Sequence, residues 1–242
     1  KTPVVGWLAT RYAGRCRVGV VARGYPFDHG APLEVLSPLD GDLGDEPAML
    51  RMQLPSSVRL WVSRDLEAGR EAAAAFCDLV LVDDGFQSRT LKKTFNVVVV
   101  DPVSSRHVVP AGPLREGWDA LECADLIWVN GKVKAAPLEV HGTEGVCVRS
   151  RYAISHCSDR NGRTESADWL RGRAVQTLCG IARPDAFYDT LHEAGAAIVG
   201  GYEVVDHGQF SAAALRELTA QEAVIVTTAK DAVRVPKWLD VW

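Results

Sequence analysis

The first two residues of the chain are of types that serve phosphate chemistry. Lys1 and Thr2 lead into an apolar run with helical spacing. A lysine followed by Ser or Thr at the start of a helix ends the G-x-x-x-x-G-K-[ST] phosphate loop, where the lysine reaches the β- and γ-phosphates and the hydroxyl binds Mg²⁺. Because such a dipeptide is common by chance, its meaning depends on the rest of the chain.

A pair of acids provides a second element of the same chemistry. Asp83 and Asp84 directly follow the four apolar residues 79–82. A carboxylate at the end of a buried strand can hold Mg²⁺ directly or through water, which is the form of a Walker B strand. A helix N-cap followed by a solvated turn is the alternative interpretation of the same residues.

Two loops present further charged groups. Residues 110–116 contain two prolines and a glycine, which make a rigid loop that presents Arg115 and Glu116 together, as a phosphate clamp beside a metal-side carboxylate requires. His207 follows an acid at 206 and could orient or polarise a catalytic carboxylate, although a surface loop is the alternative. Asp45 is interpreted from its surroundings as a helix N-cap, with Pro47 in the first turn.

The elements that must position these residues alternate between helix and buried strand. Helices are expected at 3–14, 44–54 and 65–77, and apolar runs of strand length occur at 16–25, 58–63, 78–84, 95–102 and 124–130. Unbroken apolar runs indicate strands covered on both faces, as in a parallel sheet between helices. Ligands bind at the carboxyl ends of such strands, where Arg23, Asp83, Asp101 and Asn130 stand.

Composition excludes several classes of protein. The 242 residues are 47% apolar and 24% charged, which is ordinary for a globular protein. A net charge of −4 and a pI near 5.9 give no overall attraction to nucleic acid, and we predict no nucleic-acid partner. Six cysteines without a C-x-x-C pair predict a reducing compartment and small buried apolar side chains.

Three segments are expected along the chain. Residues 1–131 form a larger α/β core domain. Residues 132–172 form a polar linker, with a small hairpin as one form of it, and residues 173–242 form a smaller α/β domain where the helix and strand rhythm returns. The predicted fold class is therefore α/β, with a parallel sheet flanked by helices and a second, smaller α/β domain.

Eight stretches in order carry a resemblance to a known family. They are "KTPVV", "ARGY", "GDEPAML", "LVDDGFQSRTL", "VPAGPLRE", "CGIARPDAFYDTL", "DHGQF" and "TTAKDAVRV". Together they resemble the tetraacyldisaccharide 4′-kinase family of Gram-negative bacteria. The resemblance implies transfer of the ATP γ-phosphoryl group, with Mg²⁺, to the 4′-hydroxyl of a tetraacylated glucosamine disaccharide 1-phosphate at the cytoplasmic face of the inner membrane. It also implies a glycine-rich loop, its strand and a membrane-associating helix upstream of Lys1.

The resemblance further implies a role for individual residues. Lys1 and Thr2 would hold phosphate and Mg²⁺, with Asp83, Asp84 and Glu116 on the metal side. Asp45 would be the catalytic base, assisted by His207 from the second domain through hinge closure. Arg115 would bind phosphate, and the substrate side would be formed by Arg23, Gln87 and Arg89.

Some positions depart from the family pattern. Ser88 and Gly208 stand where the family usually has histidine, and Ala229 stands where it usually has Glu. The stretch at residues 102–109 is shorter than the corresponding stretch of the family and lacks the Gly-Asn-Gly often found there. Two alternatives therefore remain open: a non-catalytic paralogue that acts as a binding module, and a phosphate-loop kinase or NTPase with a soluble substrate. A chain that starts within the phosphate loop would itself be inactive.

Overall fold

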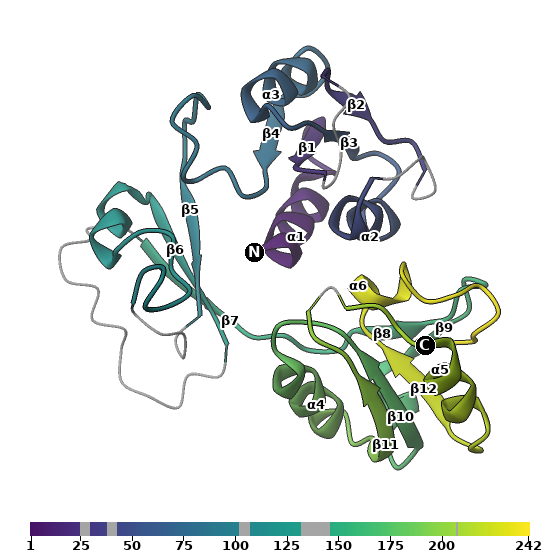
Figure 1. Cartoon of the computed structure of the whole chain (residues 1–242). Coiled ribbons are helices and arrows are strands. Elements are labelled where there is room, and N and C mark those ends of the chain that lie inside the picture. The colour runs from purple at the N-terminus through teal and green to yellow at the C-terminus, as the bar shows by residue number, and fades with distance from the viewer. Residues whose placement is uncertain (25–29, 38–42, 102–106, 132–145, 207) are drawn as a thin grey trace. The chain divides into compact units, whose positions relative to one another are not determined.

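The computed structural model describes residues 1–24, 30–37, 43–101, 107–131, 146–206 and 208–242. The chain forms two compact units, Lys1–Tyr152 and Ala153–Trp242 (Figure 1). The boundary lies within the stretch that the sequence assigns to a linker. The expected α/β class with parallel sheets flanked by helices is confirmed.

The first unit contains a four-stranded sheet in the order β2-β3-β1-β4. Its strands are β1 (Val18–Ala22), β2 (Leu33–Glu34), β3 (Arg59–Val62) and β4 (Leu79–Val82). β1 is central and pairs in parallel with β3 and β4, whereas the two residues of β2 pair antiparallel with β3. All five residues of β1 are buried, as a strand covered on both faces requires.

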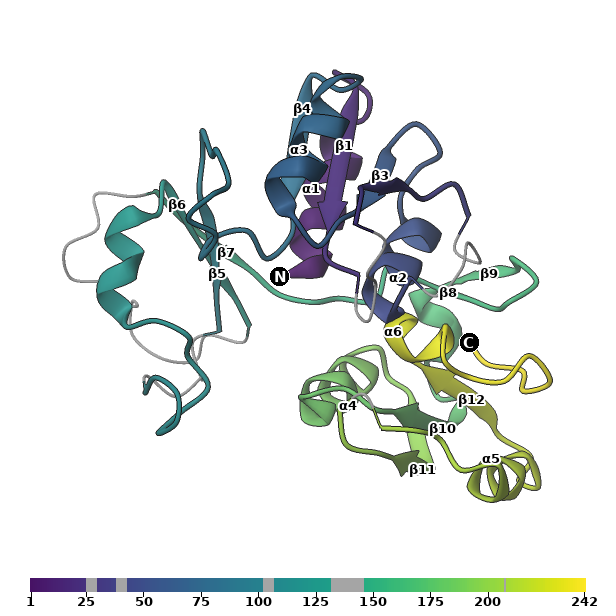
Figure 2. The same cartoon turned by 45° about the horizontal axis from the view of Figure 1, so that its top comes forward.

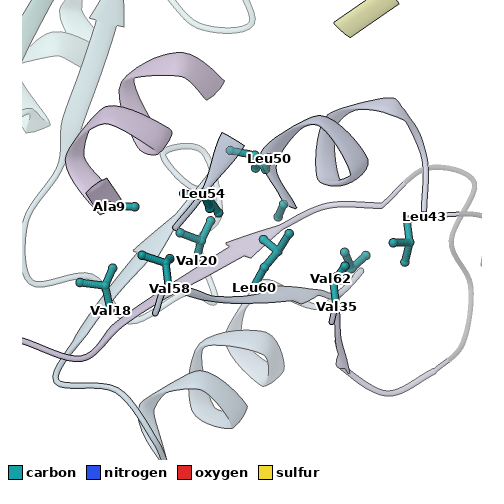
Figure 3. Packing of buried hydrophobic residues seen from close by; sticks show 11 residues of the cluster. Ala9, Val18, Val20, Val35, Leu43, Leu50, Leu54, Val58, Leu60 and Val62 are labelled. Atoms are coloured by element: carbon teal, nitrogen blue, oxygen red, sulfur yellow. The ribbon is translucent and has the colours of Figure 1, made fainter. Parts of the chain in front are cut away.

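Helices cover both faces of this sheet. Ala9 of α1 (Thr2–Tyr12) and Leu50 of α2 (Asp45–Gln53) pack with Val20 and Leu60 on one face (Figure 3). Leu66 of α3 (Leu66–Ala74) packs on the other face in a cluster with Trp61 and Val21. Successive strand residues therefore enter opposite cores, which follows from the two-residue period of a strand.

A second, three-stranded parallel sheet completes the first unit. Its order is β5-β6-β7, with β5 (Val97–Val100), β6 (Leu126–Asn130) and β7 (Val146–Ser150). A 3₁₀ helix, Trp118–Cys123, packs with Ile127 and Val129. On β6, Trp128 meets Trp7 of α1 edge to face, with ring centroids 5.4 Å apart, so an aromatic contact joins the second sheet to the helix that covers the first.

Two of the apolar strands are less buried than the sequence predicts. Every residue of β4 and β5 is half-buried, and within the described ranges the outer edge of each strand pairs with no other strand. A cavity of about 430 Å³ lies along both strands and is lined also by Val4 and Val5 of α1. The expectation of complete burial is wrong for these strands because their edges face this groove.

The second unit is a smaller α/β body. Its parallel sheet has the order β11-β10-β12, with β10 (Ala174–Cys179) between β11 (Ala197–Glu203) and β12 (Val224–Thr227) (Figure 2). The helices are α4 (Pro184–Glu193), α5 (Ala212–Thr219) and α6 (Ala229–Ala232), with a 3₁₀ turn at Ala167–Leu170. A short antiparallel pair, β8 (His156–Ser158) and β9 (Thr164–Ser166), precedes them.

Three details correct or complete the sequence analysis. Gly44, at φ 79°, caps α2, so Asp45 is its first helical residue rather than its N-cap. Cys123 and Cys147 are exposed, so burial of all six cysteines is wrong for this pair. In the part of the chain that the structure describes, every helix is too short or too polar to cross a bilayer.

Candidate active site

The topology of the first sheet gathers helix starts and strand ends at one edge. α1, α2 and α3 each precede a strand of the sheet, β1, β3 and β4 respectively. A helix that leads into a strand of a parallel sheet runs opposite to the strands and begins at their carboxyl edge. The start of α1 and the end of β4 are therefore expected at the same edge, although 81 residues separate Thr2 from Asp83.

A buried hydrogen bond confirms this placement. The Thr2 hydroxyl donates to Oδ2 of Asp83 at 2.8 Å, and the two residues are 5% and 4% exposed. The other carboxylate oxygen, Oδ1 of Asp83, is buried without a hydrogen-bond partner among the described residues. A buried carboxylate oxygen without a donor costs free energy, so this atom is suited to receive a ligand.

Asp84 lies on the exposed side of the same turn and pairs with two cations. Nζ of Lys1 lies 2.6 Å from Oδ1 of Asp84, and the Arg115 guanidinium reaches the carboxylate at 3.0 and 3.1 Å. Burial opposes ionisation, but the hydrogen bonds and charges of Lys1 and Arg115 outweigh it, so the pKa of Asp84 lies below its usual value. The residues predicted to bind phosphate and metal thus form two adjacent groups of contacts, Thr2 with Asp83 and Asp84 with Lys1 and Arg115.

The backbone of this turn has an uncommon conformation. Asp84 has φ 56°, and it is the non-glycine residue at which the described backbone enters the left-handed region. A Cβ on the following Gly85 would lie 2.8 Å from Leu91, so the turn also needs glycine there. Strained conformations of this kind concentrate at functional sites, which agrees with the role predicted for the pair of acids.

The donor set fits Mg²⁺ when phosphate is also present. The described residues contain no group of three His, Cys, Asp or Glu side chains that could form a metal cage. Mg²⁺ is usually held by one or two carboxylates together with phosphate oxygens and water. Asp83 with its unpartnered oxygen, Asp84 and the Thr2 hydroxyl match that pattern.

A second cavity, of about 350 Å³, brings together two of the three residues predicted for the substrate side and one residue, Glu116, predicted for the metal side. Gln87, Arg89 and Glu116 line it, together with the exposed Cys123. Glu116 is exposed beside Arg115 in the chain and faces this cavity. Gln87 also borders the groove along β4, so the loop after Asp84 reaches both cavities.

Of the three remaining predicted residues, the structure describes Asp45 and Arg23. Asp45 is half-buried in the first turn of α2, and Arg23 is exposed directly after β1. Since both elements meet the carboxyl edge, both side chains belong to the edge that carries Asp83. His207 lies outside the described residues, and its role stays a prediction.

Two charged residues that no sequence pattern singles out also shape the loops of the two units. Nζ of Lys93 donates to three backbone carbonyls of the loop after Asp84. In the second unit, the fully buried Asp231 binds Arg234. No local pattern identifies such contacts, because a lysine after a turn and an acid in a short helix are typical of solvated surface.

Comparison with known proteins gives a consistent result. A family model described as LpxK, tetraacyldisaccharide-1-P 4′-kinase, matches residues 1–241. Tetraacyldisaccharide 4′-kinase of Anaeromyxobacter dehalogenans strain 2CP-C is 38% identical over 260 residues, covering 97% of the chain and 68% of the relative. The enzyme of that name from Chromobacterium violaceum is 34% identical, covering 98% and 70%.

The fold also matches a solved structure. LpxK from Aquifex aeolicus, in an "apo" form in complex with ATP, superimposes with a TM-score of 0.71 at 22% identity, covering 99% of the chain and 76% of that structure. At this identity the likeness supports the fold alone.

Proposed function

The chain belongs to the tetraacyldisaccharide 4′-kinase family, whose reaction is the ATP-dependent 4′-phosphorylation of a lipid A precursor, and we propose which of its residues carry out that reaction. The observation that carries the proposal is the buried pair of Thr2 and Asp83 with one carboxylate oxygen unpartnered, beside Asp84 with its two cations.

On the nucleotide side, Thr2, Asp83 and Asp84 would hold Mg²⁺. Bound there with ATP, the ion would neutralise charge on the phosphate oxygens during transfer. Lys1 and Arg115 supply donors for the same oxygens, and their present pairing with Asp84 keeps both cations at the edge of the sheet. Glu116 is the remaining residue predicted for the metal side, but its side chain lines the cavity that holds Gln87 and Arg89, so we assign it to the acceptor side instead.

On the acceptor side, Asp45 would accept the proton of the attacking hydroxyl, because a sugar hydroxyl is a poor nucleophile. Asp45→Asn keeps the size of the side chain and removes the base, so we expect phosphoryl transfer to fall by about 10² to 10⁴-fold. The measurement is transfer of labelled γ-phosphate to tetraacyldisaccharide 1-phosphate. Glu46→Gln, which neutralises the next residue of the same helical turn, is the matched control.

Unchanged transfer in Asp45→Asn would remove Asp45 from the mechanism. We assign His207 as an assistant to the base, and His207→Ala should then lower transfer less than Asp45→Asn does.

The cavity beside Gln87, Arg89 and Glu116 would receive the phosphorylated sugar, with Arg23 contributing at the same sheet edge. Its volume and its mix of cationic and neutral polar side chains support this assignment. Because Cys123 lines this cavity and is exposed, the acceptor should slow its alkylation. Cys147 on β7 is exposed but outside the cavity lining, and its alkylation rate should not change.

The groove between β4 and β5 supports the presence of a phosphate-loop strand. Each strand has an edge that pairs with no other described strand, and both strands line this groove, so one further strand could pair with them there. We propose that this strand and the glycine-rich loop precede Lys1, in the strand, loop and helix order of such motifs. The coding sequence upstream of Lys1 tests this directly, because an upstream stretch without a β-branched run and glycines would contradict it.

Association with the cytoplasmic face of the inner membrane is proposed from the substrate. A tetraacylated acceptor does not leave a bilayer for water, so the enzyme must act at the membrane surface. Flotation with vesicles that contain the acceptor tests this. A kinase with a soluble sugar substrate is the competing assignment, and transfer to a soluble sugar without any response to the acylated disaccharide would favour it.

A further inference from the structure

A lysine outside the residues assigned so far is bonded to the loop that joins the metal side to the acceptor side. Nζ of Lys93 lies 2.6 Å from the carbonyl oxygen of Phe86, 3.1 Å from that of Ser88 and 3.5 Å from that of Gly85. An ammonium has three donors, so its whole capacity is directed at this one loop. The same Nζ also lies 5.7 Å from the centre of the Phe86 ring.

The carbonyls converge because the loop is a tight turn. The backbone N–H of Ser88 donates to the oxygen of Gly85 at 3.1 Å, and Gly85 directly follows Asp84, whose φ is 56°. A turn that points several carbonyl oxygens at one place accumulates negative partial charge there. A cation at that place stabilises this turn relative to other conformations of the loop.

The loop carries the acceptor-side residues. Gln87 lies between the bonded residues Phe86 and Ser88, and Arg89 directly follows Ser88. Both side chains line the 350 Å³ cavity with Lys93 itself. We propose that Lys93 is a positioning residue that fixes loop 85–88 and thereby places Gln87 and Arg89 for the acceptor. This inference rests on the proposed function, because it takes that cavity as the acceptor site.

The chain offers a closely matched control. Lys92 is adjacent and carries the same charge, but its side chain is 79% exposed and its Nζ lies 3.8 Å from Glu67 instead of contacting the loop. Lys93→Met and Lys92→Met each remove one positive charge and leave an unbranched side chain of similar length. Only the first removes the three bonds to the loop.

The first test is steady-state kinetics. For Lys93→Met we expect the KM for tetraacyldisaccharide 1-phosphate to rise by about tenfold, since small displacements of binding groups have large effects. The KM for ATP should stay within about twofold, since the Lys1 and Asp83 contacts are untouched. Lys92→Met should match the wild type. Lys93→Arg should rescue only in part, because a planar guanidinium does not satisfy oxygens that converge on a point.

The second test does not depend on activity. Amide hydrogen exchange in residues 85–90 should be at least about fivefold faster in Lys93→Met than in Lys92→Met, while exchange in β1 stays the same. Equal exchange in the two variants, or an equal KM for the acceptor, overturns the inference. If the wild type fails to phosphorylate the acceptor but the exchange difference is present, the assignment of the acceptor site fails and the role of Lys93 in fixing the loop stands.

Discussion

Two buried aspartates, one in each unit, differ in how completely their oxygens are bonded. Oδ2 of Asp231 accepts from the Gly180 amide at 2.9 Å and from the Thr228 hydroxyl at 2.8 Å, and Oδ1 binds Arg234. Asp83 accepts one bond from Thr2, and its Oδ1 is left without a partner among the described residues. A carboxylate with both oxygens bonded acts as structure, whereas one with an open oxygen is available to a ligand.

The partners of Asp231 extend its structural role. Arg234 also donates to the carbonyls of Gly180 and Gly208, each at 3.0 Å. Lys230, in the same short helix, binds Asp206 at 2.8 Å. Asp206 is therefore bound by Lys230 and Gly208 by Arg234, and Asp231 fixes the second of these cations.

The largest expected effect is on catalysis through Asp83. Asp83→Asn keeps an oxygen for Thr2 but removes the charge, so we expect transfer to fall by roughly 10³-fold. The free energy of unfolding should change by less than about 1 kcal/mol, because an open buried carboxylate contributes little to stability. Labelled phosphate transfer and urea unfolding measure the two quantities. Asp78→Asn, which breaks an exposed pair with Arg17, is the control and should keep full activity.

The next effect is on stability through Asp231. Asp231→Asn leaves Arg234 buried without its counter-charge, and we expect the second unit to lose about 3–5 kcal/mol of unfolding free energy. Asp168→Asn breaks an exposed pair with Arg171 in the same unit and should cost at most about 0.5 kcal/mol. Urea unfolding measures both losses of unfolding free energy. Equal losses in the two variants would contradict the contrast between the two aspartates.

Ligand binding should distinguish the two aspartates as well. A non-hydrolysable ATP analogue with Mg²⁺ at about 100 times its Kd should raise the unfolding free energy by about 2.7 kcal/mol. Addition of a chelator should reverse most of this gain. Asp83→Asn should lose the response to Mg²⁺, and Asp231→Asn, measured below its melting transition by calorimetric titration, should keep it. Retained Mg²⁺ dependence in Asp83→Asn would place the ion elsewhere.

The smallest expected effect is on the pH dependence of stability, through Glu67, whose two carboxylate oxygens both accept hydrogen bonds. Glu67 accepts from Arg70 and from the Lys92 amide, and these bonds, chiefly that of Arg70, lower its pKa from 4.5 to about 2. The folded state therefore gains stability above pH 4.5 and loses it as the pH falls from 4.5 towards 2. In acid unfolding, Glu67→Gln should flatten this part of the profile slightly.

Local patterns predicted most of the elements. The apolar runs gave β1, β3, β4, β5 and β6, and helical spacing gave α1, α2 and α3 within a few residues. β2 and β7 were missed. β2 has two residues, and β7 lies within the stretch taken as linker, where its pairing with β6 depends on a contact distant in sequence. Strand pairing of this kind is decided by the whole sheet and leaves little local signal.

The site divides in the same way. Residue type and place after an apolar run predicted Asp83 and Asp84 as candidates, because ligands bind at the carboxyl ends of such strands. The rigid loop at 110–116 predicted Arg115. The pairings themselves, Thr2 with Asp83 and Arg115 with Asp84, join residues 81 and 31 positions apart. Neither they nor the open oxygen of Asp83 can be derived from spacing, because both depend on which side chains the folded edge brings together.

The edge-to-face contact of Trp7 with Trp128 has a spectroscopic consequence. Two indoles whose centroids are 5.4 Å apart and whose planes meet at 70° share their excited states. Circular dichroism should therefore contain an exciton contribution from this pair, besides that of the Trp169 and Trp242 pair, whose centroids are 4.5 Å apart. Trp7→Phe or Trp128→Phe should remove the first contribution alone. Since Trp7 lies in the helix that begins with Lys1 and Thr2, this contribution provides a label-free optical signal for movement of that helix against the second sheet when nucleotide binds.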